Sequence, residues 1–509
     1  MGIDSNKPGW EIVLKQIGVS FDQFSLSDKI SPDIYSVLII TEPHTSIENK
    51  VINDFLSAGG AVLYSDNSIL DKTSYKTRKV SFLCSEENSP YSQVGLLDIY
   101  STIRIGKSKN SKTIDSKLNI FSTDNGTNLI LPFNINELIL NSNSRRKKFY
   151  ANRKELPSEI VAEVSKGKLR KIVEISLEYL HHKRDLPFVH LWYQPYIDKN
   201  LFIFRLDTDF CSQKDADEMY KICQSNNISA TWFLDTDSSD RLNNYALMQN
   251  QEMAIHCDKH YVYDNIEDNY NNILKAENKL KNSEISVTGF AAPFGDWNYS
   301  LDKAMQKMEL KYSSEFTLDY DDLPFYSYCN NEFSTVLQIP IHPISLGRLR
   351  RSHFSENEML QYYLNLIKWM NKVGEPVIIY HHPHHKNFNI FDTIFKFVNS
   401  QNFGNMSMGE FSNWWEERNK LEPEFQYVDN KLSVKLDSKN VFINISTNDG
   451  FTISQQRDIQ IDKITLKPHF KAIMKQDIKR IRKFHWRDLL YDHESKRSKK
   501  AFKQLGRKI

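Results

Sequence analysis

The chain has 509 residues, of which 40% are hydrophobic and 26% are charged. A chain of this length exceeds one ordinary core, because domains commonly hold about 100–150 residues, so we expect several domains. The composition is typical of a globular protein, and no apolar run approaches the roughly 20 residues that span a bilayer. An integral membrane protein is therefore not expected.

The formal net charge is only +2, but residues 463–509 hold 16 Lys and Arg against 4 Asp and Glu. Such a basic tail can be drawn to anionic lipid, which would make the protein peripheral to a membrane, or it can be a solvated tail. The sequence carries no specific nucleic-acid signal.

The N-terminal residues lack the basic and apolar regions of a secretory signal, and this predicts a cytoplasmic location. The five cysteines are dispersed without a CxxC pair, so neither a disulfide framework nor a cysteine zinc site is expected.

Residues 1–150 begin with a β-α-β pattern. Residues 36–40 and 61–64 are apolar runs typical of buried strands, and residues 46–58 between them have helical periodicity. The phrase DFLSAGGAVLYSD resembles amidotransferase-like, flavodoxin-like domains. A glutaminase needs a nucleophilic cysteine on a tight strand-to-helix turn, and Cys84 has no such glycine elbow. We therefore predict an accessory domain without catalysis.

The remaining chain divides into four parts. Charged faces and apolar repeats in residues 151–197 indicate a helical linker. Short apolar strands alternate with helical stretches through residues 198–420, which predicts an α/β fold, a distorted (β/α) barrel. Alternating residues in 421–462 indicate a small antiparallel β module, and residues 463–509 form the basic helical tail.

Two motifs in the barrel region carry candidate metal chemistry. Asp207 and Asp209 follow an apolar strand, together with Arg205, and barrel enzymes place their chemistry at such strand ends. Taken alone, these acids could equally cap the next helix. His256 and His260 lie four residues apart, so one helical turn would bring both imidazoles to one ion, although an isolated pair is more often surface histidines.

Two later segments complete the pattern. In residues 289–298, Pro293 and Gly295 predict a tight loop. Residues 377–385, VIIYHHPHH, form a strand that ends in four histidines, which could also be a simple His-rich metal tract. Because side chains alternate along a strand, one of His381 and His382 should face the site.

In this order the motifs resemble the polysaccharide deacetylase superfamily, that is, NodB-type carbohydrate esterases. The resemblance implies that Asp207 is the general base, that Asp209, His256 and His260 hold a divalent metal, and that His382 is the general acid. The implied metal is Zn²⁺, with Co²⁺, Ni²⁺ or Mn²⁺ as alternatives. The residues expected to contact substrate are Arg205, Pro293, Phe294, Gly295, Trp297 and His381.

The resemblance implies removal of an N-acetyl group from a sugar of a bacterial surface glycan or its lipid-linked precursor. The alternatives are a deformylase or another C–N hydrolase acting on a small or lipid-linked aminosugar, an inactive glycan-binding pseudoenzyme, and an interaction protein docked through its tail. Two departures bear on this choice. Ala291 stands where the family usually has an arginine, a role that Arg205 could take over, and the family's fourth motif is blurred within residues 313–322.

Overall fold

The computed structural model describes residues 1–469 except residue 6 and residues 26–29, 66–74, 107–110 and 238–241. Contacts divide the chain into two compact units. The first comprises Met1–Asn141, Val164–Ile197 and the described residues from Glu417 onward, and the second comprises Ser142–Glu163 and Asp198–Glu416. The predicted basic tail lies almost entirely outside the described residues. Within the described ranges, no helix has both the length and the apolar character needed to cross a membrane.

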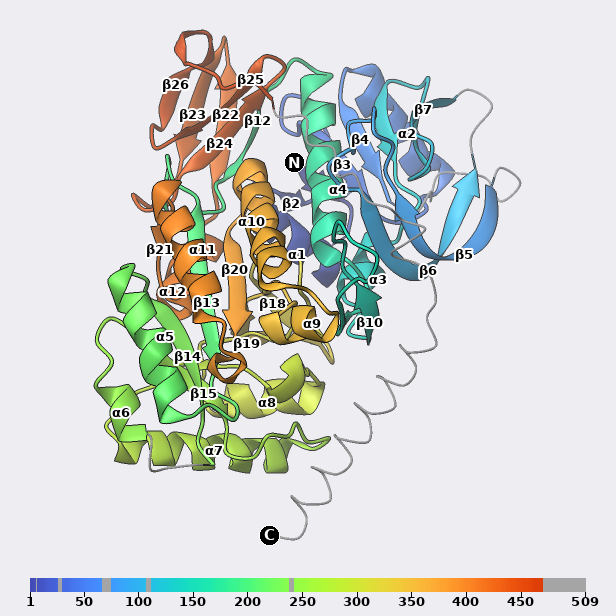
Figure 1. The fold of residues 1–509 in the computed structure, drawn as a ribbon. Coiled ribbons are helices and arrows are strands. Elements are labelled where there is room, and N and C mark those ends of the chain that lie inside the picture. Colours follow the sequence, from blue (N-terminus) through green and yellow to red (C-terminus); the bar gives the residue numbers. More distant parts are fainter. Residues whose placement is uncertain (6, 26–29, 66–74, 107–110, 238–241, 470–509) are drawn as a thin grey trace. The chain divides into compact units, whose positions relative to one another are not determined.

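The first unit is built on a seven-stranded sheet in the order β2-β1-β3-β4-β9-β8-β7 (Figure 1). The segments VLII and AVLY are wholly buried, as strands of a parallel sheet covered on both faces should be. From β2 to β9 the neighbours are parallel, an order that flavodoxin-type sheets also use. The strands are β1 (Gly2–Ile3), β2 (Asp22–Gln23), β3 (Val37–Ile40), β4 (Ala61–Tyr64), β7 (Ser111–Asp115), β8 (Ile120–Thr123) and β9 (Thr127–Ile130).

Helices cover this sheet, and a hairpin extends from it. Helix α2 packs Ile52, Phe55 and Leu56 against β3 and β4, whereas α4 contacts β3, β4 and β9 together with α1 and α3. The helices are α1 (Pro8–Ile17), α2 (Ser46–Ser57), α3 (Ile135–Ile139) and α4 (Lys166–His182), and the hairpin strands are β5 (Tyr75–Cys84) and β6 (Leu96–Gly106).

The expected helical linker at 151–197 is not what the structure shows. Helix α4 is part of the first unit, and the residues before it form a β-hairpin of the second unit, β10 (Ser144–Lys148) with β11 (Ser158–Ala162). The β-branched pair Ile160-Val161 favours a strand once β10 supplies a partner. The Ala162 N–H also donates to the Phe316 carbonyl at 3.0 Å, so a long-range pairing overrode the local helical pattern.

The expected antiparallel strands after residue 420 form two three-stranded sheets in the first unit. One of them recruits β12 (Phe188–Leu191), from the supposed linker, beside β24. Buried Arg418 donates to five backbone carbonyls, those of Lys15, Gln16, Ile17, Leu191 and Trp192. The elements are β22 (Glu424–Val428), β23 (Lys431–Lys435), β24 (Ile443–Thr447), β25 (Gly450–Ser454), β26 (Asp458–Gln460) and the 3-10 turn η4 (Ile461–Lys463).

The second unit contains a nine-stranded sheet ordered β18-β19-β17-β16-β15-β14-β13-β20, with β21 also paired to β13. All pairs are parallel except β18 with β19. No ladder joins β19 to β20 among the described residues, but the His342 N–H donates to the Ile378 carbonyl at 3.0 Å. The structure is thus mixed α/β, built on a mostly parallel sheet.

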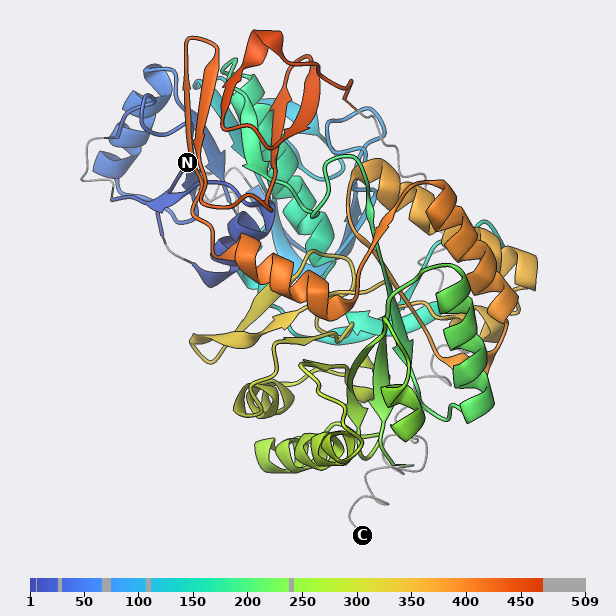
Figure 2. The same cartoon turned by 90° about the vertical axis from the view of Figure 1, so that its left-hand side faces the viewer.

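The strands and helices of this unit largely alternate along the chain, and α10 contacts β20 (Figures 1 and 2). The strands are β13 (Leu201–Asp207), β14 (Ala230–Asp235), β15 (Glu252–Cys257), β16 (Gly289–Phe290), β17 (Tyr312–Ser313), β18 (Phe325–Cys329), β19 (Glu332–Gln338), β20 (Val377–His381) and β21 (Gly404–Asn405). The helices are α5 (Gln213–Ser225), α6 (Leu242–Ala246), α7 (Ile266–Asn282), η2 (Pro293–Gly295), α8 (Tyr299–Lys307), α9 (Leu346–Arg351), α10 (Glu356–Val373), η3 (Pro383–His385), α11 (Phe388–Ser400) and α12 (Met408–Asn419).

Candidate active site

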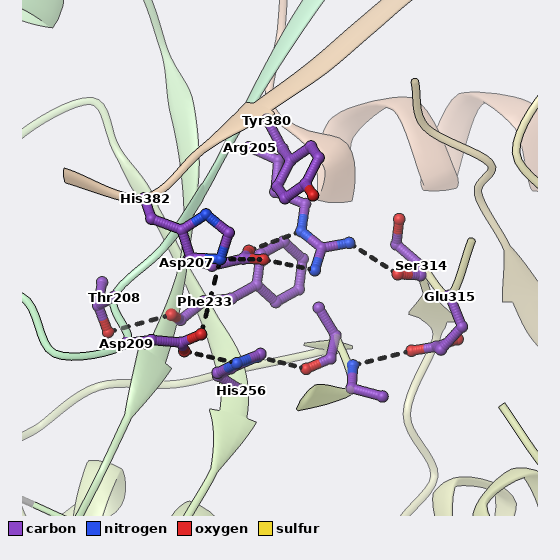
Figure 3. A network of polar contacts seen from close by, with 12 residues as sticks. Arg205, Asp207, Thr208, Asp209, Phe233, His256, Ser314, Glu315, Tyr380 and His382 are labelled. Atoms are coloured by element: carbon purple, nitrogen blue, oxygen red, sulfur yellow. Dashed lines mark hydrogen bonds and ion pairs between the residues drawn. The ribbon is translucent and has the colours of Figure 1, made fainter. Parts of the chain in front are cut away.

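Strand β13 delivers three charged side chains to the inner side of the sheet. Phe202, Phe204 and Leu206 belong to the hydrophobic core beneath the helices, so alternation turns Arg205 and Asp207 to the other side, and Asp209 follows two residues later. Arg205 is fully buried and holds Asp207 in a two-point ion pair, Nε to Oδ1 at 2.7 Å and Nη2 to Oδ2 at 2.8 Å (Figure 3).

Arg205 therefore does not reach the pocket as the expected substrate contact. Its third hydrogen bond, from Nη1 to the Ser314 carbonyl at 2.7 Å, ties β13 to the end of β17. Its guanidinium carbon lies 4.9 Å from the Phe233 ring centroid and 5.6 Å from that of Tyr380. Burial on its own would lower the pKa of Arg205, but Asp207 raises it above its usual value, so the group orients Asp207 as a permanent cation.

Asp209, His256 and His260 converge beyond the strand ends, with one ligand atom of each within 4.8 Å of the others. Asp209 Oδ1 lies 2.6 Å from His256 Nε2, and Asp209 Oδ2 lies 3.0 Å from His260 Nε2. His256 Nδ1 donates to the Ala291 carbonyl at 2.6 Å, so this ring directs Nε2 toward Asp209. One carboxylate and two imidazoles form a donor set that fits a divalent cation such as zinc, and the hydrogen bond to the Ala291 carbonyl orients one of the imidazoles.

Mutual charge sets the protonation of this triad. Burial alone would raise the pKa of Asp209, but His256 and the hydrogen bonds from both histidines hold it well below its usual range. Burial alone would lower the pKa of His256, yet Asp209 raises it to about 9. Without a metal, His256 therefore carries a proton at neutral pH, and a cation would have to displace it.

Strand β20 separates the two adjacent histidines. Val377 and Ile379 belong to the core cluster, and His381 shares their side, with its ring 4.4 Å from that of Phe391. His382 points the opposite way, with Nε2 3.6 Å from Asp209 Oδ2 and 3.9 Å from Asp207 Oδ2. The expected substrate contact by His381 is thus not supported, because its side chain packs in the core.

Burial also governs these imidazoles. It lowers the pKa of His382 to about 4, although the charges of Asp209 and Asp207 act in the opposite direction. Burial also holds the pKa of His381 well below its usual value, and neither ring nitrogen of His381 has a hydrogen-bond partner among the residues that the structure describes. The imidazoles of His381 and His382 are therefore both neutral at neutral pH.

The predicted loop forms η2 beside the triad. Gly295 has φ +60°, and a Cβ there would meet the Phe316 ring at 2.4 Å, so only glycine fits. Phe294 and Gly295 line the pocket. Pro293 is buried, and the Trp297 N–H donates to Thr317 Oγ1 at 2.8 Å. Neither residue lines the pocket.

Glu315, a residue that the sequence patterns did not single out, buttresses this loop. Its side chain is fully buried, and Oε1 accepts a hydrogen bond from the Ala292 N–H at 3.1 Å (Figure 3). Burial raises the pKa of Glu315 to about 7. The signal in the sequence was weak: a lone acid two residues past a two-residue strand, inside the blurred motif.

The resulting pocket has a volume of about 190 Å³. Asp207, Asp209, His256, His260 and His382 all line it, together with several residues that sequence reasoning missed. Buried Glu159, from the β10–β11 hairpin, pairs with Arg348 of α9. The other unpredicted lining residues are Phe210, Phe316, Ser345, Gly347, Arg351 and Tyr380, and His384 and His385 of the predicted histidine cluster also line the pocket.

No family model matches the chain, and no curated protein matches it. Among solved structures, the chain is similar to a proposed polysaccharide deacetylase from Mycobacterium smegmatis, with 13% identity, 44% of this chain and 92% of that chain covered, and a TM-score of 0.36. It is also similar to a CE4 family pseudoenzyme from Bacillus anthracis, with 14% identity, coverage of 52% and 88%, and a TM-score of 0.32. A family 4 carbohydrate esterase from Streptomyces lividans matches with 11% identity, coverage of 41% and 93%, and a TM-score of 0.30.

Proposed function

We propose that the second unit is a metal-dependent hydrolase that removes an N-acetyl or similar acyl group from a sugar of a surface glycan or its lipid-linked precursor. The observation that carries the proposal is the convergence of Asp209, His256 and His260 in one pocket with Asp207 and His382. Three ligands on one side leave room for water and a carbonyl oxygen, which is the arrangement of a catalytic rather than a structural zinc site.

A divalent cation bound there would supply a Lewis acid that polarises the acyl carbonyl and brings the pKa of a bound water to about 7. The chain's own residues then manage the protons. Asp207, fixed by Arg205, accepts the proton from the attacking water at a carboxylate oxygen.

The leaving sugar nitrogen needs a proton, because an amide anion is a very poor leaving group. His382 is neutral in the free site, since burial lowers its pKa to about 4, so its proton has to arrive during the reaction. Asp207 Oδ2 is 3.9 Å from His382 Nε2. The proton taken up by Asp207 therefore has a short path through His382 to the departing nitrogen.

A further observation favours turnover over mere binding. Ala291 occupies the position where the family resemblance led us to expect an arginine. Arg205 instead makes a buried two-point contact with Asp207 from the same strand. The charge that orients the proposed base is thus supplied from another position, and this supports turnover.

The test combines metal content with product analysis. Wild type, His256→Ala and Asp207→Asn are incubated with N-acetylated and N-formylated aminosugar oligomers, and acetate and formate are quantified. We expect one equivalent of metal in wild type and Asp207→Asn but none in His256→Ala, and product from wild type alone. Release of formate but not acetate would redirect the proposal to a deformylase. A metal-loaded wild type that binds oligomers without releasing either product would indicate the pseudoenzyme instead.

A further inference from the structure

Two phenylalanines at the pocket adopt backbone conformations that large side chains normally avoid. Phe210, directly after Asp209, has φ +54°, and Phe294 in η2 has φ +61°. Both line the pocket. Both rings also approach the same imidazole, with centroids 6.1 Å and 4.7 Å from that of His260.

Phe210 is also 71% exposed, an unusual state for a phenylalanine beside a polar site. The left-handed conformation costs a bulky residue about 1–2 kcal/mol, and glycine would adopt it without strain. The turn is fixed on both sides, since the Cys211 N–H donates to the Thr208 carbonyl at 3.0 Å and Ser212 caps α5. Neither burial nor backbone geometry accounts for an aromatic ring here, and strain of this kind gathers at functional sites.

The surroundings indicate what the rings would receive. The pocket, at about 190 Å³, is smaller than the roughly 300–1,000 Å³ of typical ligand sites, so most of a substrate must rest at the mouth. The Phe210 ring lies 6.0 Å, edge to face, from that of His384, and the charged side chains of Arg348 and Arg351 line the same pocket. An apolar surface bordered by charged groups suits a ring with C–H faces and a rim of hydroxyls better than a lipid tail.

We propose that Phe210 and Phe294 form an aromatic platform that stacks the pyranose ring of the sugar whose acyl group enters the pocket. The proposal rests on the proposed function and deepens it, because it makes a sugar ring, rather than the acyl group alone, the feature that is recognised. Phe210 is then a specificity residue that contributes to binding and not to the chemical step.

The experiment separates ring recognition from catalysis. Initial rates are measured for wild type, Phe210→Ala and Phe210→Tyr on tetra-N-acetylchitotetraose and on 4-nitrophenyl acetate, which has no sugar. We expect KM for the oligosaccharide to rise about tenfold in Phe210→Ala, equivalent to about 1.4 kcal/mol, and the loss on the aryl ester to be much smaller. Phe210→Tyr should restore KM. Leu247→Ala, which truncates a side chain that is 76% exposed outside the pocket lining, is the matched control.

Phe210→Gly provides a second readout, because it removes the ring and relieves the backbone strain. Phe210→Gly should have the same KM as Phe210→Ala but should unfold at a higher temperature than Phe210→Ala, in which the backbone strain remains. Equal losses on both substrates, or no loss on the oligosaccharide, would overturn the platform.

Calorimetric titration with the same tetrasaccharide keeps the test informative if wild type is inactive. Binding that is weakened in Phe210→Ala but not in Leu247→Ala supports the platform even though the proposed hydrolysis fails. Equal binding by wild type and Phe210→Ala, or binding by neither, overturns it. Loss of binding to phosphatidylglycerol vesicles in Phe210→Ala, with tetrasaccharide binding intact, would assign the rings to lipid and also overturn it.

Discussion

Replacing Arg205 with methionine tests the ion pair that holds the proposed base. Arg205 and Asp207 are 0% and 3% exposed, and the guanidinium gives Asp207 two hydrogen bonds and the Ser314 carbonyl a third. Methionine fills much of the same space, so the cavity left behind is small. Removing one partner of a buried pair leaves the other charge uncompensated, and this costs about 3–5 kcal/mol.

The same substitution should also lower activity. Without the two hydrogen bonds from Arg205, the Asp207 carboxylate is no longer held where it can accept the proton of the attacking water.

Hydrogen exchange of peptides from β13, together with urea unfolding of the full chain, measures the stability change. Adding Asp207→Asn should recover part of the loss, because the double variant buries no lone charge. Arg145→Met is the control, since Arg145 is 40% exposed at 3.2 Å from Glu163 and such surface pairs contribute about 0–1 kcal/mol. If Arg205→Met loses no more stability than this control, Arg205 does not offset the buried charge of Asp207.

Three further predictions follow from the site. His256→Ala should lose the metal while the fold is retained. In wild type, the metal affinity measured by competition with a chelator should fall as the pH drops below about 9, because protons compete with the metal for His256. His382→Gln should lower kcat by about 10²–10⁴ with metal retained. His381→Leu should keep kcat and unfold at the same or a higher temperature, since it removes from the core two ring nitrogens without a hydrogen-bond partner among the described residues. Equal losses of kcat in the two variants would contradict the assignment. Because the pKa of Glu315 rises from 4.5 to about 7, wild-type stability should decline with rising pH in that window, and Glu315→Gln should unfold at higher urea than wild type at pH about 8 but not at about 5.

The sequence by itself determined the features that follow from the alternation of side chains along a single strand. The apolar strand before Asp207 and the period of two along β13 place Arg205 and Asp207 on one side. The same rule on β20 separates His381 from His382. These are local consequences of strand geometry, and a short stretch of sequence contains all the information they need.

Only the tertiary structure decided what the strands bring together. The β-branched residues Ile160 and Val161 favour a strand, but nothing local in residues 158–162 indicates that Glu159 lies against Arg348. The residues around Glu315 do not indicate that its carboxylate supports the loop after β16. The periodicity of β13 could not show that Arg205 does not line the pocket. These outcomes depend on pairing between segments far apart in the chain, and burial in that packed interior, rather than the residue type alone, fixes each group's partner and charge.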